Sequence, residues 1–69
     1  MYILQEMQTT GAQTALVPAQ TFTDKNQAES AYHQALAAAA VSSVPVHAVV
    51  LLDEHGNVMR REYYEHMGE

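Results

Sequence analysis

The chain has 69 residues, no cysteine, and a net charge of −5 from three basic and eight acidic residues. A chain of this length buries only about 60% of the surface that it exposes when unfolded, so we expect one domain, residues 1–69, with a thin core. The lack of cysteine excludes disulfides, thiolate metal sites and cysteine nucleophiles. Negative charge has the wrong sign for holding nucleic-acid phosphates, so we expect no nucleic-acid partner.

The apolar segments are too short to predict a membrane span. The longest uninterrupted apolar run, residues 35–41, falls far short of the roughly 20 residues that a spanning helix needs. The N-terminal stretch MYILQEMQTT has no basic start and carries Glu6 within its apolar part, which is not typical of a signal peptide. We therefore expect a soluble, cytoplasmic protein without a membrane partner.

Two strands are predicted in the first third of the chain. Residues 2–7 are rich in Tyr, Ile and Leu, and the following TTGAQ segment with Gly11 is typical of a loop. Residues 14–22 form the second predicted strand. Because Pro18 has no backbone N–H to donate, this strand is expected at an edge of the sheet.

A helix is predicted after these strands. Thr23 and Asp24 are both favourable N-caps, and Gln27 stands three residues after Asp24 as a capping-box partner. The serine pair at 42–43 ends the pattern, and Pro45 disfavours helical geometry at the residue before it. Between these limits, apolar residues recur at the spacing of one helix face: Ala28, Ala31, Tyr32, Ala35, Leu36 and Ala39.

The segment that follows the helix predicts a strand with two apolar faces. Between residues 44 and 52 every even position is apolar, which indicates one buried face. The odd face contains His47, Val49 and Leu51 and is half apolar, more than a face in contact with solvent requires. We therefore expect the odd face to be covered as well.

A hairpin completes the predicted elements. In the turn DEHGNV, Gly56 suits the left-handed position that closes a short hairpin loop. The last strand runs from residue 58 to about 64. Its register is open, because either Val58 and Tyr64 or Met59 and Tyr63 can point inward.

These elements predict an α+β fold of order ββαββ, in which a single helix packs on a four-stranded, mainly antiparallel sheet. Short connections favour the spatial order 2-1-3-4. One helix covers only one face of such a sheet, and we expect that face to carry the even positions of the third strand. The half-apolar odd face then predicts self-association, most simply a two-fold dimer that packs sheet against sheet or edge against edge.

The candidate catalytic and metal-binding residues form no recognisable site. His33 is expected on the polar face of the helix and His47 on the strand face away from it, so the two rings do not meet. Ser42 and Asp53 stand at opposite ends of a strand, roughly 30 Å apart, which argues against a serine triad with His47. The sequence has no HExxH or HxH spacing for zinc and no glycine-rich loop, and it starts with Met1 rather than a catalytic proline. We predict that the protein is not an enzyme and uses no cofactor or metal.

The segment from residue 60 to residue 64 holds two arginines and two tyrosines, residue types that are common at binding hot spots. It fits a recognition strip, and it also fits a terminal strand that packs one tyrosine on each face. Together with the odd face of the preceding strand, it supplies our candidate interaction residues. These are His47, Val49, Leu51, Arg60, Arg61, Tyr63 and Tyr64.

The stretch NQAESAYHQALAAAAVSSVPVHAVVLLDEHGNV, residues 26–58, resembles a set of small uncharacterised bacterial proteins encoded in prophage-like or mobile regions. The helix, the Val-Pro turn and the following strand carry the resemblance, which covers about half of the chain. The resemblance implies a compact, standalone αβ protein. It brings no activity, cofactor or site residue.

Our leading hypothesis is a non-enzymatic small protein that forms a homo-oligomer, most simply a dimer, and acts by contact with an unidentified protein. The contact would use the outer sheet face and the strand from residue 60 to 64. The alternative is a small-ligand or metal-binding protein whose site is completed across the oligomer and lined by His47 and Tyr64. A third possibility, an inhibitor of a basic or nucleic-acid-binding protein, rests on net charge alone.

Overall fold

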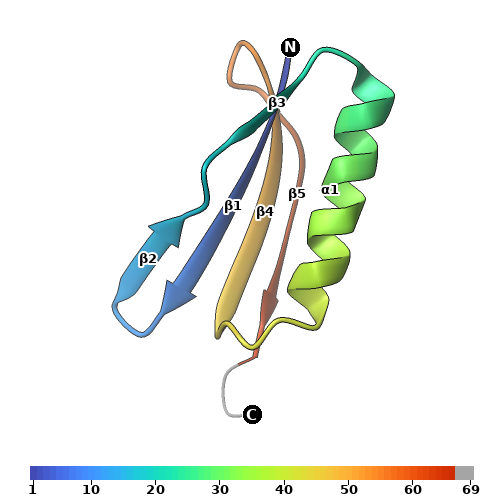
Figure 1. Ribbon diagram of the computed structural model, residues 1–69. Helices are drawn as coiled ribbons and strands as arrows, with labels where there is room; N and C mark the ends of the chain where they lie inside the picture. The colour runs from blue at the N-terminus through green and yellow to red at the C-terminus, as the bar shows by residue number, and fades with distance from the viewer. Residues whose placement is uncertain (67–69) are drawn as a thin grey trace.

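The structure is a computed structural model that describes residues 1–66, and within them one helix packs on one side of a five-stranded sheet (Figure 1). This confirms the α+β class with a single helix on an antiparallel sheet. The elements are β1 (Tyr2–Thr10), β2 (Gln13–Leu16), β3 (Gln20–Phe22), α1 (Lys25–Ala40), β4 (Val46–Asp53) and β5 (Val58–Glu65).

The sheet follows the order β2-β1-β4-β5, and β3 pairs with the same side of β1 as β2 does. All of its pairings are antiparallel. The predicted order of strands is therefore found, but the predicted count of four is wrong, because the strand expected over residues 14–22 is split into two. Pro18 lies in the break, where a residue without an N–H cannot continue a ladder. The edge position expected from Pro18 is confirmed.

The helix begins where its capping signal predicts. The side chain of Asp24 accepts a hydrogen bond from the backbone N–H of Gln27 at 3.1 Å, which satisfies one of the free amides of the first turn. The helix buries Ala28, Tyr32 and Ala39 against the sheet. Since two of these three are alanines, the helix axis can approach the strands closely.

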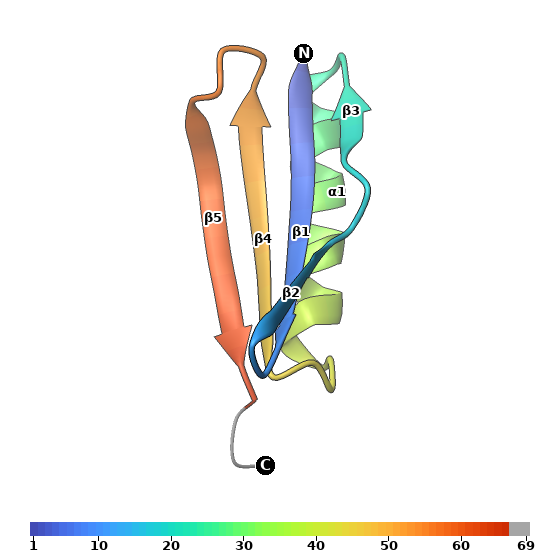
Figure 2. The same cartoon turned by 90° about the vertical axis from the view of Figure 1, so that its left-hand side faces the viewer.

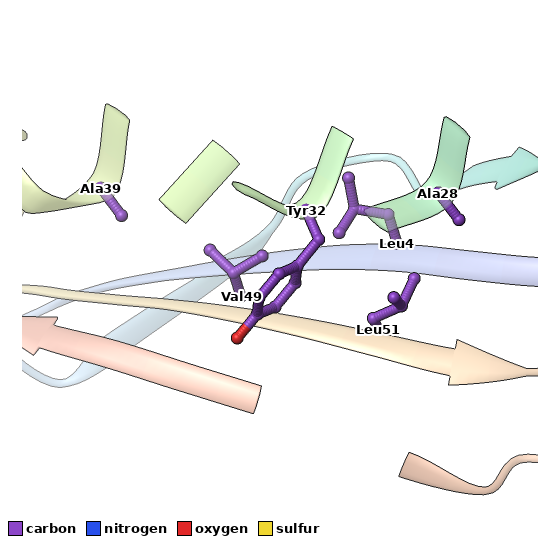
Figure 3. Close-up of a cluster of buried hydrophobic side chains, with 6 residues drawn as sticks. All are labelled: Leu4, Ala28, Tyr32, Ala39, Val49 and Leu51. Atoms are coloured by element: carbon purple, nitrogen blue, oxygen red, sulfur yellow. The ribbon is translucent and has the colours of Figure 1, made fainter. Parts of the chain in front are cut away.

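The core lies between α1 and the strands β1 and β4 (Figure 3). Leu4 of β1 stands directly opposite Leu51 of β4, and the ring of Tyr32 extends from the helix beside Val49. Val49 and Leu51 are the largest side chains that are fully buried. Within residues 1–66 these are the only large side chains that are fully buried, so the core is thin, as the chain length predicts.

The predicted orientation of β4 is wrong. His47, Val49 and Leu51 were expected on the outer face, yet all three are buried beneath the helix. The residues at even positions, expected beneath the helix, lie on the opposite face and are half-buried. Both faces of this strand are apolar. The alternation of odd and even residues therefore separates the two faces but does not indicate which of them the helix covers.

The last strand contains an irregularity that the two predicted registers did not include. Leu51 pairs with Arg60 and Leu52 pairs with Val58, which leaves Met59 as an extra residue, a β-bulge. The bulge shifts by one residue the alternation of β5 side chains between the two faces of the sheet. As a result Met59 and Tyr64, one from each predicted register, both pack against the core.

The face of the sheet opposite α1 carries no helix from the described part of the chain. Figure 2 looks onto this face and shows α1 behind the strands. Within residues 1–66, no helix is both long enough and apolar enough to cross a membrane.

Candidate interaction surface

The surface opposite α1 is assembled from alternate residues of three strands. Residues that stand opposite each other in a ladder point to the same face, so the pairs can be followed across the sheet. Ala48 of β4 stands between Met7 of β1 and Tyr63 of β5, and Val50 stands between Gln5 and Arg61. We call the complete set the open face: Ile3, Gln5, Met7, Thr9, Val46, Ala48, Val50, Leu52, Val58, Arg61, Tyr63 and Glu65.

The open face has an uncharged centre and a charged margin. The members from β1 and β4 are apolar or neutral polar, and its two charged residues, Arg61 and Glu65, both belong to β5. Leu16 of β2 extends the apolar area beyond β1, because it stands opposite Met7 and is 66% exposed. An apolar centre with charge confined to the rim is the usual arrangement of a protein interface.

A shallow hollow lies within the open face. Its volume is about 260 Å³, and it is lined by Met7, Ala48, Val50, Arg61, Glu62 and Tyr63. Pockets that enclose a small molecule usually measure about 300–1,000 Å³. The hollow is smaller than that, and its size fits a side chain inserted by another protein better than an enclosed ligand.

The predicted strip over residues 60 to 64 is divided between the two sides of the sheet. Arg61 and Tyr63 belong to the open face, and the Tyr63 side chain is 56% exposed. Arg60 lies on the helix side, where its Nε donates a hydrogen bond to Glu29 of α1. Tyr64 also lies on that side and packs against the core. The four residues therefore do not form one continuous patch.

His47 occupies a closed position beneath the helix. It is 5% exposed, and its Nε2 lies 3.0 Å from Oε1 of Glu6 on the neighbouring strand. Its other ring nitrogen, Nδ1, is buried and has no partner within the described residues. The predicted position of His47 on an outer surface is wrong. The alternative function, a ligand or metal site completed across an oligomer and lined by His47 and Tyr64, stays a prediction.

The remaining polar side chains have local structural contacts. The hydroxyl of Ser42 accepts a hydrogen bond from the backbone N–H of Val44 at 3.0 Å, as expected where a helix passes into a strand. Hydrogen bonds from the side chain and backbone of Asn57 hold the pKa of Asp53 below its ordinary value. His33 is exposed and lies 3.9 Å from Glu29, one turn away on the helix.

The side chains of the described residues bring together no group of three or more potential metal ligands. Burial raises the pKa of Tyr32 above its ordinary value, and the nearby carboxylate of Glu62 adds to the shift. The open face is therefore the feature of residues 1–66 with the clearest potential for binding.

Comparison with known proteins adds no relative: no protein-family model, no curated protein and no solved structure matches this chain. The resemblance of residues 26–58 to small bacterial proteins stays a prediction. The candidate surface accordingly rests on the geometry of this chain alone.

Proposed function

We propose that this protein acts without catalysis, by protein contact, and that its open face binds the open face of a second copy. The observation that carries the proposal is the uncharged apolar centre formed by Ile3, Met7, Val50 and Leu52, over which no helix of residues 1–66 packs. Large contiguous apolar patches are uncommon on monomers and usually mark a contact surface.

The size of the open face supports this assignment. The strands β4 and β5 are each 8 residues long. At about 3.3 Å per residue and about 4.8 Å between strands, β1, β4, β5 and the edge formed by β2 and β3 span about 26 by 19 Å, or about 500 Å². Two such sheet faces would together bury about 1,000 Å², which reaches the minimum expected of a specific protein interface.

The thin core supports a second copy as the occupant. The helix side provides only Val49 and Leu51 as large, fully buried side chains. A sheet-to-sheet contact would place the side chains of the two open faces in one shared layer about 10 Å thick, with the two helices on the outside. The assembly would then have three apolar layers where a single copy has one.

The contact can be tested with two variants that introduce the same charge. Ala48→Lys places an ammonium group at the centre of the open face, next to Met7 and Tyr63. Ala38→Lys places it on the exposed side of α1 and serves as the matched control. The measurement is light scattering on a sizing column over a range of protein concentrations.

We expect the unmodified chain and the Ala38→Lys variant to show a mass of two or more copies of the 7.6 kDa chain, and Ala48→Lys to show half the mass of the unmodified chain. A mass of one copy at every concentration would contradict the proposal. An increase in mass that requires zinc and is reversed by a chelator would instead support the metal-binding alternative.

A further inference from the structure

The two edges of the sheet differ in how well they are protected from further pairing. One edge is formed by β2 and β3, which are 4 and 3 residues long and are separated by a break at Pro18. The other edge is β5, with 8 residues and no proline. Proteins commonly interrupt or shorten exposed edges to prevent pairing with another chain. In β5 the bulge at Met59 interrupts the start of the strand, whereas the stretch from Arg61 to Glu65 is regular.

The hydrogen bonds of β5 show which of its backbone groups point outward. The N–H of His66 donates to the carbonyl oxygen of Pro45 at 2.7 Å, so the backbone N–H and C=O of His66 point toward β4. The backbone N–H and C=O groups of successive residues point to alternate sides of an antiparallel strand. Those of Arg61, Tyr63 and Glu65 therefore point away from β4. The N–H of Tyr63 donates instead to the carboxylate of its own neighbour, Glu62, at 3.1 Å.

The outer edge of β5 is also accessible. Figure 2 shows α1 displaced toward β1 and β3, so the helix leaves the edge of β5 clear. Five of the eight residues of β5 lie in the regular stretch from Arg61 to Glu65, after the bulge at Met59. A second strand can pair with this stretch because its backbone groups alternate regularly between the two sides of the strand.

We propose that β5 pairs antiparallel with β5 of a second copy about a two-fold axis at Tyr63. In this register the two Tyr63 side chains are neighbours, and each Arg61 stands opposite Glu65 of the other copy. The outward N–H and carbonyl groups of these residues meet as hydrogen-bonded pairs. The result is two cross-strand ion pairs on either side of an aromatic pair, both favourable combinations.

The registers centred nearer the start of β5 bring like charges together. An axis at Glu62 would place the two Glu62 carboxylates directly opposite each other, and an axis at Arg61 would do the same to the two arginines. Like charges directly opposite are destabilising. An axis at Tyr64 avoids like charges but loses both pairings of Arg61 with Glu65, so the register centred on Tyr63 is the one that joins opposite charges and an aromatic pair.

This inference rests on the proposed function in that both assume association with copies of the same chain, but it uses a different surface. The sheet-to-sheet contact has its two-fold axis in the plane of the sheet, whereas the edge contact has its axis perpendicular to the sheet. The two contacts are compatible. They close into an assembly of four copies when the two axes meet, that is, when the in-plane axis runs across the strands and keeps both β5 edges on the same side.

The test uses two charge reversals at one ladder position. Alone, Arg61→Glu places two carboxylates opposite each other at both ion-pair positions, and alone, Glu65→Arg places two cations there. An equal mixture of the two variants restores opposite charges at both positions. The measurement is the mass in solution at low salt, where ion pairs are screened least.

We expect the unmodified chain to have four copies, each single variant half that mass, and the mixture to recover four. Unchanged masses for the single variants, or a mixture that stays at half mass, would overturn the edge contact. The recovery cannot come from misfolding, because both components of the mixture are the same variants that fail alone.

A variant of the open face separates this inference from the proposed function. In a chain with Ala48→Lys, the edge contact alone predicts a mass of two copies. Adding Arg61→Glu to this chain should lower the mass to one copy. Mixing that double variant with a chain that carries Ala48→Lys and Glu65→Arg should restore a mass of two copies. If Ala48→Lys leaves the mass of the unmodified chain unchanged, the sheet-to-sheet contact is wrong. If it reduces the mass to one copy, the edge contact is wrong.

Discussion

The two faces of β4 have nearly the same composition and very different surroundings. Val49 and Leu51 are fully buried beneath α1, whereas Val50 and Leu52, each one position further along the chain, lie on the open face and are half-buried. The helix converts one apolar face into a core and leaves the other in contact with solvent. This difference is the basis of the proposal that the open face makes a contact outside the monomer.

The largest expected loss of stability is at Leu51, and it should contrast with a small loss at the neighbouring Leu52. Leu51→Ala should lower the free energy of unfolding by about 2–5 kcal/mol, because it leaves a cavity in a thin core. Leu52→Ala should cost much less in the monomer, since its side chain already contacts solvent. Urea unfolding at a concentration where both variants have the mass of one copy measures the difference. Equal losses would show that the two faces are equally packed within one chain.

A smaller effect is expected from the polar pair on the covered side. Glu6→Ala removes the partner of His47 Nε2 and leaves that buried nitrogen unsatisfied, at a cost of about 1–3 kcal/mol. Glu6→Gln keeps an oxygen acceptor and should retain much of the stability. The free energies of unfolding of the two variants test this pairing. It would be contradicted if alanine and glutamine at this position had the same effect.

The smallest expected effect is on the pH dependence of the free energy of unfolding, through Tyr32 on the covered side. Because burial raises the pKa of Tyr32, the folded state binds the phenol proton more tightly than the unfolded state does. The stability from this difference is fully present below the ordinary value of 10.0 and is lost as the pH rises through the folded pKa. Urea unfolding above pH 10.0 should therefore show a steeper loss for the unmodified chain than for Tyr32→Phe. Identical slopes would contradict the assignment of the shift to Tyr32.

The parts of the fold that depend on local chemistry could be predicted from the sequence. The cap at Asp24 was correctly located, as were the edge position of the strand with Pro18 and the turn closed by Gly56, which has a φ of 84°. Each of these depends on one residue and its immediate neighbours. The two consecutive hairpins and the helix between them then left few arrangements of the sheet.

The orientation of β4 depended on a contact distant in the sequence and was not predictable from alternation. His47 looked like a residue for an exposed face until the structure placed Glu6, 41 residues earlier, beside its Nε2. Glu6 lies on the same side of β1 as Leu4, and a carboxylate there calls for a polar partner such as His47. That pairing was the signal in the sequence that could have reversed the assignment. It would also have placed Ala48 and Val50 on the open face.

The measurement that tests the open face most directly is the rate of thiol labelling at a single introduced cysteine, since the chain has none of its own. The thiol of an Ala48→Cys variant lies at the centre of the open face, and that of Ala38→Cys lies on the exposed side of α1. If a second copy covers the open face, the labelling rate of Ala48→Cys falls as the protein concentration rises, and the rate of Ala38→Cys stays constant. A labelling rate at position 48 that does not depend on concentration would contradict the central claim.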